Sequence, residues 1–359
     1  MEALLGKTLE ELQTIAQSVG LQKFAGKQLA EWLYVRRVKT IDEMTNISLK
    51  GREALKERYI IGRHAPVREA LSADGTRKYL FEVSNLHSPT SASKSCFIET
   101  VYIPEEERAT LCVSTQAGCK MGCRFCMTGT LGFHGHLPAG EILNQIFEVD
   151  ALAVSQQQPA LTNIVYMGEG EPMDNLDAVL RSLAIMTASY GAAWSPKRIT
   201  VSTVGIPAMK RFLDESECHL AVSMHNPFVN ERAQIMPAEK LMSITEVISL
   251  LKQYDWAHQR RVSFEYICWG GKNDSPRHAK EILRLLRGLN CRINLIRFHE
   301  GVERVAKTSM EERHFPASNE KQMEWMRDYL TENGITTTIR RSRGEDILAA
   351  CGMLVNALQ

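Results

Sequence analysis

The amino-acid sequence predicts an α/β protein in which a partial parallel β/α barrel follows a small helical domain and a short β-rich extension. Three observations lead to this prediction. From residue 110 onward, apolar runs suited to buried strands alternate with segments of helical period. Residues 1–65 carry helix start signals, and residues 66–109 contain runs that alternate as antiparallel strands do. We expect the barrel to span residues 110–340 and a C-terminal tail to span residues 341–359.

The helical domain is predicted from two start signals. Thr8 and Glu11 form a capping-box pattern, and Thr40 with Glu43 repeats it. The apolar stripe between these signals contains Leu29, Trp32 and Leu33. Eleven Lys and Arg residues against eight acidic residues give the segment a net charge of +3. That excess fits contacts with nucleic-acid phosphates, and it fits an ordinary solvated helical face equally well.

Two runs predict the strands of the β-rich extension. Residues 77–83 alternate after the turn signal Asp74-Gly75, and residues 95–103 follow as a second run. Residues 84–94 between them are polar. The two runs are therefore expected to pair as a small antiparallel extension.

Seven further apolar runs predict the barrel strands, near residues 110–114, 162–167, 198–203, 219–224, 261–267, 291–297 and 335–340. Because strand–helix–strand crossovers are right-handed, these strands should align as a parallel sheet that curls into a full or partial barrel. Functional side chains would then gather just beyond the carboxyl ends of the strands.

Three cysteines at CxxxCxxC spacing follow the first barrel strand in a loop bounded by Gly118 and Gly129. Such a loop can wrap its sulfurs around one face of an iron–sulfur cube. Since a cube has four iron corners, Cys119, Cys123 and Cys126 would leave one iron free for a non-protein ligand. The alternatives are a zinc knuckle, which needs a fourth Cys or His, and cysteines that serve as small apolar core residues.

Cysteine count and hydropathy bear on the cellular compartment. Nine cysteines form an odd set, which disfavours standing disulfides and favours metal or redox use. No segment has the apolar length of a membrane span, and the N-terminal residues do not follow a signal-peptide pattern. We therefore expect a cytoplasmic protein without membrane contact. A net charge of +1 does not select a class of partner.

Several polar residues stand at or beyond the ends of the predicted strands. In the turn at residues 168–172, glycines allow close approach of a ligand, and a carboxylate can accept hydrogen bonds from an ammonium or hydroxyl group. A cofactor with a free amino-acid end would suit this turn. Ser202, Ser223, His225 and Asn294 have comparable positions on later strands. Taken singly, such residues are more often structural than ligand-binding.

Longer stretches resemble one enzyme family. The cysteine loop resembles that of radical S-adenosylmethionine (SAM) enzymes. Five further runs resemble the bacterial dual-specificity ribosomal and transfer RNA adenine carbon-2 methyltransferases, at residues 98–104, 109–114, 170–172, 294–296 and 343–352. The resemblance covers nearly the whole chain, N-terminal helices included, and the run around Cys351 is its most specific part.

The resemblance implies a fold and a set of cofactor ligands. The fold would be a partial (β/α)6-type radical SAM barrel. A [4Fe–4S] cluster would be held by Cys119, Cys123 and Cys126. Two SAM molecules would be used per turnover, at a site formed by Gly170, Glu171, Ser202, Ser223, Met224, His225 and Asn294. The enzyme is expected to be monomeric and to need an electron donor such as flavodoxin.

The resemblance also implies a reaction. Carbon 2 of adenine bears a hydrogen of no useful acidity, so ordinary attack on a methylsulfonium fails there. In the family, the residue matching Cys351 first takes a methyl group from one SAM, and a 5′-deoxyadenosyl radical from a second SAM then removes a hydrogen atom from that methyl group. The methylene radical adds to the adenine carbon. Glu99 would accept the ring proton, and Cys112 would release Cys351 by forming a transient disulfide.

The implied substrates are one adenine in the peptidyl-transferase centre of 23S ribosomal RNA and the adenine adjacent to the anticodon of some transfer RNAs. An adenine attacked at carbon 2 must leave its stack, which RNA loops permit more readily than duplexes. The candidate phosphate contacts are the basic N-terminal helices together with Arg340, Arg341 and Arg343.

Three other hypotheses stay open on the sequence. A related branch methylates carbon 8 of the same ribosomal adenine, although Gly-Glu-Pro at residues 170–172 favours the carbon-2 branch. A radical SAM enzyme with a non-RNA substrate and a non-catalytic RNA-binding module with structural zinc are the other two. Departures from the family pattern that bear on pocket shape are Met127, Glu169 and Trp269-Gly270-Gly271.

Overall fold

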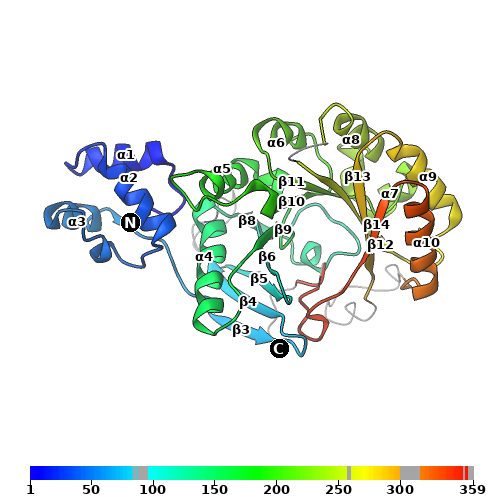
Figure 1. The fold of residues 1–359 in the computed structure, drawn as a ribbon, viewed down its shortest axis with the longest axis horizontal. Coiled ribbons are helices and arrows are strands. Elements are labelled where there is room, and N and C mark those ends of the chain that lie inside the picture. Colours follow the sequence, from blue (N-terminus) through cyan, green and yellow to red (C-terminus); the bar gives the residue numbers. More distant parts are fainter. Residues whose placement is uncertain (84–85, 87–95, 257–259, 300–315, 351, 355–359) are drawn as a thin grey trace.

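The computed structural model describes residues 1–83, 86, 96–256, 260–299, 316–350 and 352–354 (Figure 1). In this part of the chain, one ten-stranded sheet has the order β14-β13-β12-β11-β10-β9-β6-β5-β4-β3. Its strands are β3 (Arg68–Leu71), β4 (Arg77–Val83), β5 (Cys96–Pro104), β6 (Ala109–Cys112), β9 (Asn163–Tyr166), β10 (Ile199–Thr203), β11 (His219–Ser223), β12 (Val262–Cys268), β13 (Cys291–Arg297) and β14 (Thr336–Arg340).

The direction of pairing changes at β6. From β6 through β9 to β14 every described pair is parallel, whereas β3, β4, β5 and β6 pair antiparallel. The α/β prediction and its barrel strands are confirmed. The antiparallel strands continue the barrel sheet, because β6 pairs with β5 on one side and with β9 on the other. The sequence did not predict β3, and the polar residues 84–94 fall outside the described residues except for position 86.

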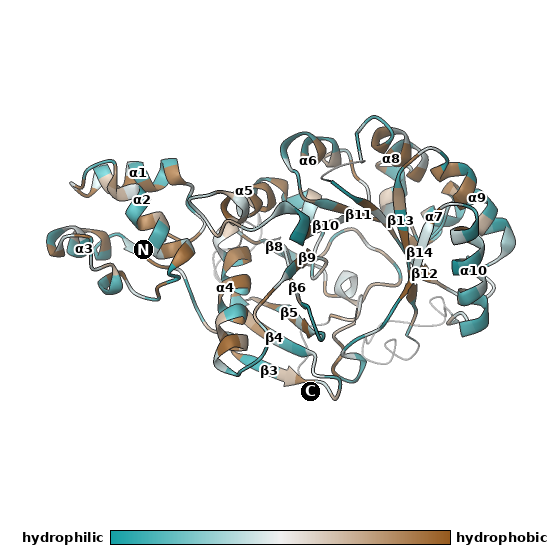
Figure 2. Ribbon diagram, in the orientation of Figure 1, coloured by the Kyte–Doolittle hydropathy of each residue, from teal (hydrophilic) through white to brown (hydrophobic). Residues whose placement is uncertain are grey.

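Helices surround the outer side of the curved sheet in Figure 1. They are α4 (Ala139–Ser155), α5 (Leu176–Thr187), α6 (Met209–Glu215), α7 (Val229–Ile235), α8 (Ile244–Leu251), α9 (Pro276–Leu286) and α10 (Glu320–Glu332). Their apolar faces join the strand side chains that point toward the helices in one core, and the hydropathy colouring shows brown residues on the sheet side of several of them (Figure 2). Among the described residues, no helix combines the length and the apolar character needed to cross a membrane.

The first 65 residues form a group of helices beside the barrel (Figure 1): α1 (Leu9–Ser18), α2 (Ala25–Ala30) and α3 (Leu49–Lys56), with β1 (Glu2–Ala3) paired to β2 (Tyr59–Ile60). The capping box at Thr8 is confirmed. The box at Thr40 is also present, but it starts only a short 3-10 turn, Ile41–Glu43. The predicted stripe of Leu29, Trp32 and Leu33 is buried.

Charged pairs tie this helical group to α4. Arg63 Nε donates to Glu148 at 2.7 Å, and both side chains are almost fully buried. Arg37 pairs with Asp150, and Lys39 lies 3.5 Å from Glu148. Three of the basic residues that suggested phosphate contacts therefore face a barrel helix.

Strands β4 to β6 have two distinct faces, since successive side chains of a strand point to opposite sides. Tyr79, Ile98 and Leu111 belong to the apolar core. The intervening positions carry Lys78, Glu99, Val101 and Cys112, and we call this side the cavity face; of these four, Cys112 is part of the wall of the cavity described below, whereas Lys78, Glu99 and Val101 are not. Lys78 is paired across the strands with Val101, and Val101 with Cys112. This alternation places the predicted proton acceptor and the predicted resolving thiol on the same side of the sheet.

Candidate active site

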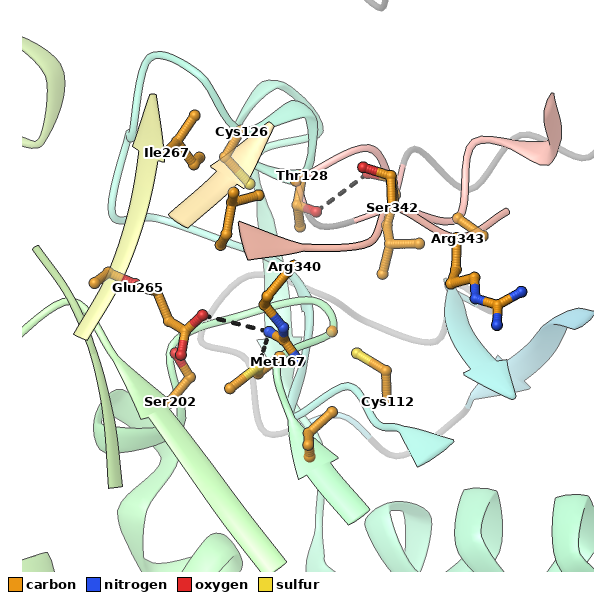
Figure 3. Close-up of a pocket in the computed structure, with 18 of the residues that line it drawn as sticks. Cys112, Cys126, Thr128, Met167, Ser202, Glu265, Ile267, Arg340, Ser342 and Arg343 are labelled. Atoms are coloured by element: carbon orange, nitrogen blue, oxygen red, sulfur yellow. Dashed lines mark hydrogen bonds and ion pairs between the residues drawn. The ribbon is translucent and has the colours of Figure 1, made fainter. Parts of the chain in front are cut away.

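A cavity of about 340 Å³ opens at the carboxyl ends of the barrel strands. Its wall includes side chains from β6, β9, β10, β11, β12 and β14, from the cysteine loop, and from the C-terminal tail. Figure 3 shows Cys112, Cys126, Ser202 and Glu265 around this space, with Arg340 between them. Several of the side chains that the sequence singled out therefore lie together at this edge of the sheet.

The cysteine loop, residues 118–129, is held at three points by backbone hydrogen bonds. The amide of Cys119 donates to Gly132 O at 2.9 Å, that of Arg124 to Ile235 O at 3.0 Å, and that of Met127 to Gly352 O at 2.8 Å. A hairpin of β7 (Gln116–Gly118) and β8 (Phe133–His136), which the sequence did not predict, closes the base of the loop. Gly118 has φ +70°, and a Cβ there would lie 1.9 Å from Gly132 O, so glycine is required.

The three thiols of this loop are close enough to influence one another electrostatically. Burial, with a smaller contribution from the neighbouring Cys126, raises the pKa of Cys119 to about 12. Burial also raises the pKa values of Cys123 and Cys126, with smaller opposing hydrogen bonds at Cys126. Cys123 and Cys126 line the cavity, whereas Cys119 packs against the apolar core.

These thiols suit a polynuclear cation better than a single ion. Within the described ranges, no three His, Cys, Asp or Glu side chains converge as one metal ion requires. In a cubane cluster each cysteine binds a different iron, so the sulfurs do not converge on one point. Ionising three partly buried thiols so close together without a cation would be costly, and a positively charged iron–sulfur core offsets that cost. The residues present therefore fit a [4Fe–4S] cluster.

Glu171 and Gly170 lie in the wall of the cavity, as predicted. The Glu171 carboxylate accepts hydrogen bonds from Thr203 Oγ1 at 2.7 Å and from the Val204 amide at 2.9 Å. Burial raises the pKa of Glu171 to about 7 against these hydrogen bonds. Gly170 has φ +96°, and a Cβ there would lie 2.5 Å from the Gln116 side chain, which packs beneath the turn.

His225 also reaches the cavity, and its protonation state follows from its contacts. Nδ1 accepts a hydrogen bond from the Ile267 amide at 3.0 Å, so the ring proton resides on Nε2. Burial lowers the pKa of His225 to about 3, and the charge of Arg232 contributes. The imidazole is therefore neutral. Ser202 and Ser223 line the cavity, whereas Met224 is buried in the core and is not part of the wall.

Asn294 is not part of the cavity wall, but its side chain is hydrogen-bonded to Glu265, which is. Its amide nitrogen donates to Glu265 Oε1 at 2.7 Å, and its oxygen accepts from Thr338 at 2.8 Å. Glu265 lines the cavity and is 3.3 Å from Arg340 Nη1. Sequence reasoning missed Glu265, and it assigned Arg340 to phosphate contacts; here Arg340 pairs with a carboxylate inside the cavity (Figure 3).

A fully buried arginine behind the cavity was also missed. Arg232 on α7 donates three hydrogen bonds to backbone carbonyls. The acceptors are Val204 O after β10 at 2.6 Å, Ser223 O at the end of β11 at 2.8 Å, and Met224 O directly after β11 at 2.9 Å. Glu239 balances its charge. Arg232 therefore fixes the strand ends that carry the predicted SAM-binding residues.

The departures from the family pattern have structural roles near the cysteine loop. Trp269 is buried and its ring lies 5.3 Å from that of Phe125, within the loop. Met127 is buried, and its amide binds the tail. Glu169 is buried and accepts from the amides of Glu99 at 2.8 Å and Gly118 at 3.1 Å. It thus joins strand β5 to the start of the loop.

The described part of the C-terminal tail is fastened to the turn between β3 and β4. Asp346 accepts from Ser72 Oγ at 2.5 Å and from the Ala73 amide at 3.0 Å. Asp74 accepts from the Gly344 amide at 3.0 Å. Burial opposes ionisation of Asp74, but hydrogen bonds from Thr76 and Gly344 outweigh it and lower the pKa of Asp74 to about 2. Arg343, a candidate phosphate contact, lies 3.8 Å from the same carboxylate.

Beyond this anchor, the tail packs over the cavity face. Ala349 and Leu354 form a small apolar cluster with Val101 and Cys112. Ala350 and Gly352, on either side of position 351, line the cavity. Cys351 itself lies outside the described residues.

If the activity is the RNA methylation that the sequence resemblance implies, replacing Asp346 with Ala should lower the yield of methylated RNA roughly tenfold, because the anchor that positions the tail is lost. Iron content and SAM cleavage should be unchanged, since the cysteine loop is separate. A single-turnover assay measures both products. Asp328→Ala, which removes an exposed carboxylate from α10, is the matched control. Equal methylation by the two variants would contradict a positioning role for the anchor.

Comparison with known proteins adds independent evidence. Residues 3–61 match the family model described as "Ribosomal RNA large subunit methyltransferase N-terminal domain". A relative from Bacteroides fragilis, "Probable dual-specificity RNA methyltransferase RlmN", is 55% identical over 359 residues, 99% of this chain and 97% of the relative. "Dual-specificity RNA methyltransferase RlmN" of Syntrophus aciditrophicus is 37% identical, over 97% and 94% of the two chains.

A solved structure is similar over the same extent. The crystal structure of a radical SAM methyltransferase from Sphaerobacter thermophilus matches with a TM-score of 0.87 and 35% identity, over 99% of this chain and 100% of that one. The similarity therefore includes the helical group, the barrel and the tail.

Proposed function

This chain belongs to the RlmN family of dual-specificity RNA methyltransferases, and from that premise we propose that it methylates carbon 2 of a specific adenine in 23S ribosomal RNA and of the adenine adjacent to the anticodon in some transfer RNAs. The single observation that carries the proposal is one cavity lined by the cysteine loop, by Cys112 and by the residues flanking position 351. The proposed cluster ligands, the proposed resolving thiol and the two neighbours of the proposed methyl carrier then share one space.

The cofactors follow from the donor set. SAM would bind between the Gly170-Glu171 turn and the ends of β10 and β11, where the neutral His225 presents Nε2–H as a donor. Cys119, Cys123 and Cys126 would hold the [4Fe–4S] cluster. When bound, the cluster supplies the electron that cleaves SAM to methionine and the 5′-deoxyadenosyl radical.

The chain's own residues would carry the methyl group. Cys351 would displace it from one SAM as a thioether and, after loss of one hydrogen atom, join it to carbon 2 of the adenine. Glu99 would accept the ring proton. Cys112 would then attack the sulfur of Cys351, so that an S–S bond forms, the S–CH2 bond breaks, and its electron pair goes to the carbon, which takes up a proton. The tail contacts of Val101 and Cys112 support this assignment.

The RNA would enter over the polar rim of the cavity. Arg108, Arg297, Arg341 and Arg343 lie in its wall. Glu105, Glu320 and Asp74 pair with Arg108, Arg297 and Arg343, and contacts with RNA phosphates would replace or share these ion pairs. The helical group would extend this surface. A dithiol would reduce the disulfide, a flavodoxin-like donor would supply electrons, and the enzyme would act as a monomer. The dual-specificity name of the relatives favours two RNA substrates over the carbon-8 alternative, which has one.

Mapping of methylated adenines tests the proposal. Total RNA from cells with and without this protein should differ at two positions, each by methylation of carbon 2. Mass spectrometry of the protein expressed with ample SAM should also show one extra methyl group on Cys351, and the Cys351→Ala variant should lack it. Methylation at carbon 8, or unchanged RNA, would refute the proposal.

A further inference from the structure

We propose that Lys78 is a positioning residue that keeps the Glu99 carboxylate ionised and holds it beneath the C-terminal tail. The inference rests on the proposed function, because it assigns a role in the release of the enzyme–RNA adduct. No sequence motif singled out Lys78, which stands in the middle of an alternating strand pattern.

The geometry places Lys78 between the acceptor strand and the tail. Its Nζ lies 2.9 Å from Glu99 Oε1, and the two side chains are 1% and 0% exposed. The same nitrogen is 3.4 Å from Leu348 O, three residues before position 351. One ammonium group therefore touches both the proton acceptor and the segment that carries the methyl carrier.

Because both side chains are buried, the charge of the Lys78 ammonium group has a strong effect on the Glu99 carboxylate. A carboxylate out of reach of water tends to take up a proton unless a cation or donors stabilise its charge. Titratable groups that neighbouring elements bring to this region include the Cys112 thiol on β6 and Glu169 after β9. Neither of these carries positive charge. Lys78 supplies a cation in direct contact with the carboxylate, which favours an ionised Glu99.

An ionised Glu99 is what the release step needs. Addition of the methylene radical gives a neutral radical adduct, and one electron has to leave it; the cluster that gave up an electron in SAM cleavage would, when bound, take one back. Carbon 2 of the resulting cationic adenine bears both a hydrogen and the methylene group that is joined to the carrier sulfur. The C–H bond breaks, its proton goes to the Glu99 carboxylate, and its electron pair stays in the ring and restores aromaticity. The ring becomes neutral, so charge and atoms balance, and attack by Cys112 follows.

Lys78→Met tests the proposal in a single-turnover reaction of the reconstituted full-length enzyme with SAM, dithionite and an RNA fragment that contains the target adenine. We expect methylation of Cys351 and 5′-deoxyadenosine formation near the wild-type level. Decay of the covalent adduct at pH 7 should slow about tenfold. Its rate should recover as the pH rises toward 9, because the acid limb of the profile moves up by roughly one unit or more. Lys78→Arg should retain the wild-type profile.

Two further variants cover the cases in which Lys78→Met does not fold or loses activity for a reason unrelated to Glu99. Lys78→Gln retains a hydrogen-bond donor without the charge and should show the same pH shift if Lys78→Met does not fold. Lys210→Met removes an exposed lysine on α6 and should behave as wild type. An unshifted profile for the Gln variant, or an equal loss in every step, would overturn the role of Lys78. Failure of the wild-type protein to form any adduct would instead count against the proposed function.

Discussion

Replacing Cys112 with Ala is expected to leave the protein covalently attached to its RNA. The methylene link can still form, because the cysteine loop and the carrier do not depend on this thiol. Release should fall by about 10³-fold or more, since no other described cysteine is part of the cluster that Cys112 forms with the tail. A denaturing gel with labelled RNA measures the trapped fraction.

Cys268→Ala is the matched control, because Cys268 is a fully buried barrel cysteine outside the cavity wall. That variant should turn over normally and trap no RNA. Free enzyme and normal methylation in the Cys112→Ala reaction would show that a different thiol resolves the adduct.

The second large effect is expected for Cys126→Ala. The substitution removes a thiol that is partly buried, lines the cavity and lies in the loop fixed by three backbone hydrogen bonds. With only two cysteines left, the cluster should be lost, and 5′-deoxyadenosine should fall below detection. Iron analysis and electron paramagnetic resonance of the reduced protein measure the cluster directly.

A cysteine outside the loop again provides the comparison. Cys291 stands at the start of β13, where burial raises the pKa of its thiol, and Cys291→Ala should keep its iron. A Cys126→Ala protein that still cleaves SAM on reduction would remove Cys126 from the ligand set.

The sequence predicted the features that depend on the periodicity of apolar residues and on the spacing of motif residues, namely the strands and the family. Strands 77–83 and 219–224 were found because their apolar residues alternate or run together, and the family was identified from runs that span the chain, which the relatives confirm. The placement of the cysteine loop at the strand ends follows from barrel geometry. The roles of the site residues and the domain boundaries stay predictions.

The sequence could not predict contacts between distant segments. Lys78 and Arg232 look like ordinary charged positions until the fold buries them, because their partners lie on other elements. Asn294 shows the converse case. It stands at the expected strand position, but its side chain is engaged by Glu265 and Thr338. Glu169 was noticed only as an unusual residue, and its two backbone partners explain it.

The anchor of the tail has a consequence for how the protein is made. Ser72 and Asp346 are 274 positions apart, so the segment that contains Asp346 is synthesised long after the strand turn to which it binds. Contacts between such distant positions tend to form late in folding. The turn between β3 and β4 is therefore available early in synthesis, but the tail can pack over the cavity only after all the barrel strands that precede it in the sequence have been made.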